Sequence, residues 1–98
     1  GAPGARLSPT MPAERLLDVS GLAPPEPLVA VLDVVFTLNP GEYLRVRHHR
    51  EPFPLYAILD EHGFDHRTQH GGAVPFEILI WGRGDDAARA ALPAGAGT

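Results

Sequence analysis

The chain has 98 residues, which suits one small domain, with 44% apolar residues and a formal net charge of −4. It contains no cysteine, which excludes disulfides, thiolate metal sites and persulfide chemistry, and no lysine, which excludes Schiff-base catalysis. The acidic balance argues against nucleic acid as a partner, and no apolar run approaches the roughly 20 residues of a membrane span. We therefore expect a cytoplasmic protein without membrane contact.

The first predicted strand is the short apolar run from Arg15 to Val19, which Gly21 ends. A helix is expected to begin near Pro25, because proline suits a first helical turn whose N–H groups lack partners. The sequence Asn-Pro-Gly at 39–41 stops this helix. Its buried stripe, at helical spacing, consists of Leu28, Val31, Leu32 and Val35.

The second strand and helix follow in the same order. Residues 42–48 alternate as expected for a half-exposed strand. The next helix is predicted from Pro52 to His62, followed by a hairpin over 64–81 that turns at 71–72. One face of the alternating strand carries Leu44, Val46 and His48, and the other carries Tyr43, Arg45, Arg47 and His49.

The two ends of the chain lack such patterns. Residues 1–13 are rich in alanine, glycine and proline and predict a flexible leader, so the domain itself is expected over 14–82. Residues 83–98 predict a flexible tail, in which a brief helical turn at 86–92 is an option.

A nine-residue pattern occurs twice and relates the two units. Residues 25–33 and 52–60 both read P-x-P-L-x-A-(V/I)-L-D, each after a strand-like run. The predicted order β-α-β-α-β-β indicates an α/β fold of the α+β two-layer sandwich type, with two helices on one face of a four-stranded mixed sheet. The loops 20–25 and 48–52 then leave the carboxyl ends of parallel strands, so this edge is the expected ligand position.

Two motifs carry a family resemblance. The first, L-D-V-S-G-L-A-P-P-E-P at 17–27, resembles the L-D-x-x-G-L-x-C-P-x-P signature of the TusA/SirA sulfur carriers. Pro24 stands where those carriers have their cysteine, so a persulfide carrier is not implied. The second, R-V-R-H-H-R-E-P-F-P-L-Y at 45–56, is similar to a cysteine-free, uncharacterised branch of small bacterial domains with L-D-V-x-G-L-x-P-P-E-P and R-H-x-R-E-P-x-P-L-Y motifs.

This resemblance implies a TusA-like fold over about residues 15–81 and no assigned activity. Similar domains occur alone, in tandem, or beside hemerythrin-like and nitrogen-oxide-related proteins. The resemblance therefore implies a nitrogen-oxide or redox setting as one context, without a mechanism.

The densest chemistry lies at 47–51, where two histidines stand between charged residues. Imidazole suits zinc, iron, copper and nickel, so His48 and His49 are candidate ligands of a metal ion or haem. On a strand these two side chains point to opposite faces, so at most one serves a given ion unless the strand ends between them. The remaining histidines are expected to face solvent: His62, His66 and His70.

The same edge offers an anion site as an alternative. Arg47 and Arg50 could hold a carboxylate or phosphate, but prolines remove N–H donors from both helix N-termini. Negative charge from Glu26 and Glu51 also lies there, so ion pairs Arg47–Glu51 or Arg50–Glu26 are expected to join the loops. The candidate binding edge comprises Glu26, Arg47, His48, His49, Arg50, Glu51 and Tyr56.

The sheet face without helices is a candidate protein interface. Tyr43, Arg45 and Trp81 are expected there, and aromatic and arginine side chains are frequent anchors of interfaces. Either a protein partner or a homodimer would use this face. The alternative is that Trp81 shields the end of the sheet, since single exposed apolar residues are common.

No catalytic constellation is evident, because Ser8 and Ser20 lack a matching histidine and acid. The sequence therefore predicts a small non-enzymatic binding or interaction module with no resident cofactor. The alternative is a metal- or haem-associated accessory domain that uses His48 or His49.

Overall fold

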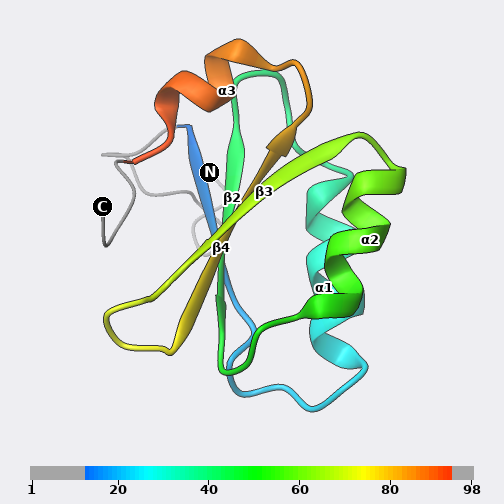
Figure 1. Cartoon of the computed structure of the whole chain (residues 1–98), viewed down its shortest axis with the longest axis vertical. Coiled ribbons are helices and arrows are strands. Elements are labelled where there is room, and N and C mark those ends of the chain that lie inside the picture. Colours follow the sequence, from blue (N-terminus) through cyan, green and yellow to red (C-terminus); the bar gives the residue numbers. More distant parts are fainter. Residues whose placement is uncertain (1–12, 94–98) are drawn as a thin grey trace, which may run out of the picture.

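The computed structural model describes residues 13–93, which form a four-stranded sheet and three helices (Figure 1). The strands are β1 (Glu14–Asp18), β2 (Tyr43–His48), β3 (Phe64–Gln69) and β4 (Phe76–Gly82), and the helices are α1 (Glu26–Val35), α2 (Phe53–Glu61) and α3 (Asp86–Ala91). Apart from Ala13, the predicted leader lies outside the described residues. None of the helices between residues 13 and 93 is long and apolar enough to cross a membrane.

The sheet has the strand order β1-β2-β4-β3. β1 runs parallel to β2, and β4 runs antiparallel to both of its neighbours. Helices α1 and α2 lie side by side on one face of this sheet (Figure 1). The predicted fold class, a mixed four-stranded sheet with two helices on one face, is confirmed.

The main core lies between the sheet and these two helices. Strand alternation sends Leu44 and Val46 to this side, as predicted, and β4 contributes Ile78 and Ile80. Each such side chain stabilises the fold by about 1.5–3 kcal/mol when it leaves water, before the conformational entropy cost is subtracted. The helices supply Val31, Val35, Leu55 and Leu59, each at most 1% exposed.

A second, smaller apolar cluster lies on the opposite face of the sheet. Here α3 packs through Ala88 and covers Tyr43, Leu79 and Trp81. The Asp85 carboxylate caps α3 by accepting a hydrogen bond from the Ala88 N–H at 3.1 Å, and it ties α3 to the loop before β2 by accepting one from the Gly41 N–H at 2.9 Å. The sequence predicted either a flexible tail or a brief helical turn at 86–92. The structure has the helix, α3, and it packs on the sheet. Residues 94–98 of the predicted tail lie outside the described residues.

Candidate functional site

A pocket of about 440 Å³ opens at the edge where β1 and β2 end and where α1 and α2 begin. The parallel pairing of β1 with β2 places the loops that follow them side by side. We call this cavity the proline pocket, because five of its lining residues are prolines: Pro24, Pro25, Pro27, Pro52 and Pro54. Leu28, Val31 and Leu55 complete its apolar wall, and His48, Arg50 and Glu51 are its polar members.

The repeated P-x-P pattern explains why this wall is apolar. Pro25 and Pro52 occupy the N-cap positions of α1 and α2, and neither helix has a side-chain cap. A second proline follows in the first turn of each helix, and proline has no N–H to donate. The two helix N-termini therefore lack the row of N–H donors that usually binds phosphate.

His48 lies at the carboxyl end of β2 and is only 5% exposed. Its Nδ1 accepts a hydrogen bond from the Arg50 backbone N–H at 3.2 Å. Burial lowers the pKa of His48 below its ordinary value of 6.5, and the positive charges of His49 and Arg50 lower it further. The imidazole is therefore neutral at pH 7 with its proton on Nε2, which makes Nε2 a hydrogen-bond donor.

β2 ends at His48, so His49 lies beyond the strand and the opposite-face expectation does not apply; the two rings lie beside each other, although His49 does not line the pocket. The two ring centroids lie 5.3 Å apart, and His49 Nδ1 is buried without a hydrogen-bond partner in the described part of the chain. Within residues 13–93 no group of three or more histidine, cysteine, aspartate or glutamate side chains could hold a metal ion. The lone pair of His48 is already engaged at Nδ1, so this side chain would ligate a metal only after losing that hydrogen bond.

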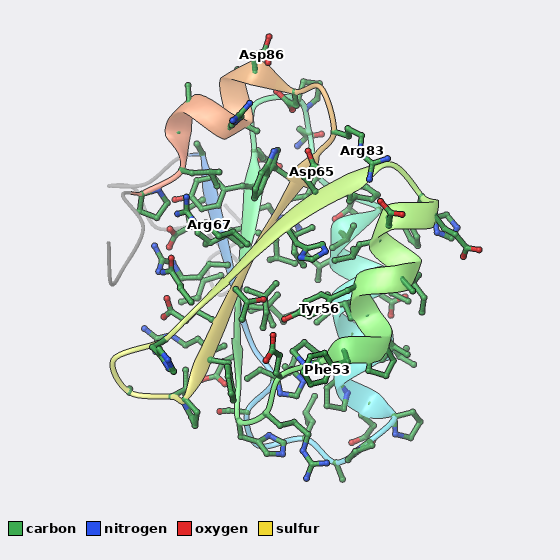
Figure 2. The ribbon with its side chains drawn as sticks, in the orientation of Figure 1. Phe53, Tyr56, Asp65, Arg67, Arg83 and Asp86 are labelled. Carbon is green, nitrogen blue, oxygen red and sulfur yellow. The ribbon has the colours of Figure 1, made fainter. Side chains whose placement is uncertain are left out.

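Glu51 and Tyr56 connect the rim of the pocket to β3. The Tyr56 hydroxyl donates to Glu51 Oε2 at 3.1 Å and accepts a hydrogen bond from the Thr68 hydroxyl. Figure 2 shows Tyr56 projecting from α2 toward the strands, with Phe53 one turn earlier on the same helix. Burial raises the pKa of Tyr56 above its ordinary value of 10.0. The Glu51 carboxylate is therefore bound by a residue of α2, which is itself bound to β3.

His66 differs from its expected solvent-facing position. Its ring stacks on the ring of Tyr56, with centroids 4.3 Å apart and planes 6° from parallel. The register of β3 explains this placement, because His66 pairs with Ile80, whose side chain lies in the main core. His66 therefore supports Tyr56 and indirectly Glu51.

Four members of the predicted edge do not line the pocket: Glu26, Arg47, His49 and Tyr56. Glu26 is exposed in the first turn of α1, and Arg47 points to the opposite sheet face, where its Nε lies 3.7 Å from Glu77. Neither expected ion pair, Arg47–Glu51 or Arg50–Glu26, forms among the described residues. Both loops instead contribute apolar residues to the wall of the pocket.

Residues 16–82 match the model of a family described as uncharacterized conserved protein (DUF2249). The chain belongs to this family. No curated protein and no solved structure matches it. All residues that line the proline pocket fall inside the DUF2249 span, whereas α3 lies beyond it.

Of the candidate interface residues, Tyr43 and Trp81 are buried in this DUF2249 protein, whereas Arg45 is partly exposed. Tyr43 is fully buried and Trp81 is 9% exposed, because α3 packs over both. Their accessibility to a partner or a second copy would require α3 to move away. The sequence analysis placed these side chains on the correct sheet face but left that face open.

Arg45 forms an ion-pair network that sequence analysis did not identify. Its guanidinium lies 2.9 Å from Glu14 of β1 and 2.7 Å from Glu77 of β4. The Tyr43 hydroxyl also donates to Glu14, at 2.7 Å. Burial and the neighbouring Glu14 carboxylate raise the pKa of Tyr43 to about 12. The outward alternation of Glu14 and Glu77 could have signalled this network once the strand order was known.

Proposed function

We propose that this DUF2249 protein is a small non-enzymatic binding module whose ligand occupies the proline pocket. The observation that carries the proposal is the pocket itself. Its volume of about 440 Å³ falls within the roughly 300–1,000 Å³ of small-molecule sites, and its walls are mainly apolar with a few polar groups. It also lies at the carboxyl edge of parallel strands, where ligands bind in open α/β sheets.

The polar groups of the pocket support binding over catalysis. No serine, threonine or tyrosine lines it, so its lining offers no hydroxyl nucleophile. His48 donates through Nε2 and cannot act as a base there, because its free lone pair at Nδ1 accepts the Arg50 N–H. Glu51 is held by Tyr56. These groups can orient a ligand, and they lack the partners that acid–base chemistry needs.

The same geometry weighs against His48 as the ligand in the accessory-domain alternative. A haem or metal ion would need an unprotonated nitrogen, and the hydrogen bond at Nδ1 places the proton of His48 on Nε2. The element order supports kinship with TusA/SirA-like proteins as part of the proposal. Pro24 at the carriers' cysteine position supports a role other than sulfur transfer.

An NMR titration tests the proposal with two probes of equal shape, 4-phenylbutanoate and 4-phenylbutanamide. We expect saturable amide shifts in the segments 24–31 and 48–55 with at least one probe at sub-millimolar to millimolar concentration. Both probes carry a phenyl group because this group fills apolar pockets efficiently. Absence of saturable shifts with both probes would refute the proposed site.

A pair of neighbouring variants locates the binding. Leu28→Trp places a larger side chain at the pocket wall and should abolish the shifts, whereas Val29→Trp should leave them intact, since Val29 is 53% exposed and does not line the pocket. Pro54→Trp provides a second blocking variant at an exposed lining position. Circular dichroism verifies that each variant is folded, and equal binding by all three variants would place the ligand elsewhere.

A further inference from the structure

We infer that the ligand of the proline pocket is a small apolar carboxylate, with its hydrocarbon part between the proline walls and its carboxylate bound by Arg50 and the Nε2–H of His48. This inference rests on the proposed function, because it concerns the same pocket. It goes further by naming the charge of the ligand and the two side chains that recognise it.

His48 supplies a fixed neutral donor. Its Nδ1 is occupied by the Arg50 backbone N–H, so the ring orientation and the position of the proton are both set. The ring lines the pocket at the end of a central strand, where surrounding residues hold it at 5% exposure. A donor that is preorganised in this way adds affinity for an acceptor oxygen without a cost for ordering the side chain.

Arg50 supplies the charge. It is exposed at the mouth of the pocket, and it forms no salt bridge with any residue in the described range 13–93. The other arginine near this edge, Arg47, is turned to the opposite face beside Glu77. Arg50 is therefore a cation at an apolar cavity whose planar guanidinium is suited to a carboxylate.

Glu51 is the one negatively charged residue among the lining residues, and it would repel a ligand carboxylate. Its position reduces this repulsion. The Tyr56 hydroxyl holds it toward α2 and β3. Arg50, in contrast, lines the pocket together with His48, and its positive charge contributes to the lowered pKa of His48 after burial. A ligand carboxylate beside His48 and Arg50 therefore meets a favourable potential, which Glu51 weakens.

The apolar walls select against inorganic anions. Phosphate and sulfate retain their hydration unless several N–H groups replace it, and the prolines have removed those groups from both helix N-termini. Two donors suffice for the two oxygens of a carboxylate, and the rest of the pocket then favours hydrocarbon. Two sources share this chemistry: a free aliphatic or aromatic acid, and the carboxyl terminus of a peptide that ends in an apolar residue.

The deciding experiment compares affinities for 4-phenylbutanoate and 4-phenylbutanamide by calorimetry or NMR. We expect the acid to bind about tenfold more tightly than the amide, because one charge-assisted hydrogen bond contributes about that factor to the affinity. Arg50→Gln should remove this preference, while Arg89→Gln, the same charge change at an exposed position on α3, should keep it. Equal affinities of the acid and amide for the unsubstituted protein would overturn the inference and leave the proposed function standing, whereas no binding of either would overturn both.

Glu51→Gln provides a test of opposite sign. Removal of the competing negative charge should tighten binding of the acid by about threefold, consistent with a partly screened interaction. Weaker binding by this variant would show that Glu51 attracts the ligand, which contradicts a simple carboxylate.

To separate the two sources, acetyl-Gly-Gly-Leu with a free carboxyl terminus is compared with 4-methylpentanoate. Tighter binding of the peptide indicates a chain terminus, tighter binding of the free acid indicates a small molecule, and no binding of either overturns the inference.

Discussion

The two faces of the sheet are stabilised in different ways. On the face covered by α1 and α2, the buried cluster consists only of aliphatic side chains, which come from α1, α2, β2 and β4 and from Val19 after β1. On the face covered by α3, four buried side chains lie next to an ion-pair network centred on Arg45. We call these the aliphatic face and the charged face.

The difference shows which face determines stability and which determines register. Apolar burial is non-directional, so the aliphatic face tolerates small displacements. The charged face is directional, because Arg45 of β2 must lie between Glu14 of β1 and Glu77 of β4 at 2.9 and 2.7 Å. A shift of β1 or β4 by one residue would send these carboxylates to the other side of the sheet.

The charged face is also the less completely satisfied of the two. Buried atoms without a hydrogen-bond partner in the described part of the chain include Nε of Arg47 and of Arg67 and Oε1 of Gln69, all on this face by strand register. Figure 2 shows Arg67 on the side of β3 away from α1 and α2, and its NH2 group donates to the Pro93 carbonyl at 2.7 Å. Polar atoms left in this state reduce net stability, so we expect the aliphatic face to contribute more.

The largest effect is expected from a cavity in the aliphatic face. Leu59→Ala should lower the free energy of unfolding by about 2–5 kcal/mol, because Leu59 is fully buried and its replacement leaves a void. Leu16→Ala is the control, since Leu16 is 53% exposed, and it should change stability by less than about 0.5 kcal/mol. Urea denaturation measures both. A loss below 1 kcal/mol for Leu59→Ala would show that the helices can close the cavity.

A smaller loss is expected when the network of the charged face is interrupted. Glu77→Gln removes the negative charge that lies 2.7 Å from Arg45 and 3.7 Å from Arg47, and it should cost about 2 kcal/mol because both guanidinium groups lose a neighbouring counter-charge. Asp60→Asn, at the exposed ion pair with Arg83, should leave the urea midpoint unchanged. If the Glu77 variant is as stable as the parent, the network sets register without contributing stability.

The aliphatic face and the location of the pocket followed from sequence periodicity. Alternation along β2 placed Leu44 and Val46 inward, and the two loops after parallel strands were expected at one edge, where the structure brings His48, Arg50 and Glu51 together. These inferences rest on local spacing, which a single sequence contains, and on the general right-handedness of strand-helix-strand connections.

Features that depend on long-range partners were not predicted. The repeated P-x-P-L pattern relates the two units but does not predict how each helix packs: Pro27 of α1 is buried whereas Pro54 of α2 is exposed, because the two helices turn different sides to the sheet. The pairing of Arg47 with Glu77 depends on strand register, which the sequence alone did not specify. The cover provided by α3 depends on Asp85, whose partner Gly41 is 44 residues away.

A third change should detach α3 while leaving the aliphatic face intact. Ala88→Glu puts a charge among Tyr43, Leu79 and Trp81, and it should cost about 1–2 kcal/mol, the docking energy of one short helix. The chain has a single tryptophan, so a red shift of its emission reports exposure of Trp81 directly. Ala90→Glu, at an exposed position of the same helix, should not shift the emission. Loss of all far-ultraviolet signal at Ala88→Glu would mean that the two faces unfold together.

Each face also has its own titrating group, and the charged face is expected to lose stability at high pH. The pKa of Tyr43 is raised to about 12 from 10.0, so the folded state resists ionisation that the unfolded state undergoes. The contribution of Tyr43 to stability should therefore be constant below pH 10 and decline between pH 10 and 12. Tyr43→Phe should reduce this decline, measured by thermal denaturation. The chain has no lysine, which leaves its two tyrosines as the side chains that titrate in this range.

On the aliphatic side, His48 should give a smaller effect of opposite sign. Its pKa is lowered by burial, so the unfolded state takes up a proton near pH 6.5 that the folded state resists. Stability is then fully present above pH 6.5 and declines as the pH falls below it. His48→Gln should flatten this acid slope, and His70→Gln, which removes an exposed imidazole, should not. Nitrogen-15 NMR of the imidazoles at pH 7 checks the same geometry directly, because a proton found on Nδ1 of His48 would contradict both the slope and the donor that the pocket ligand requires.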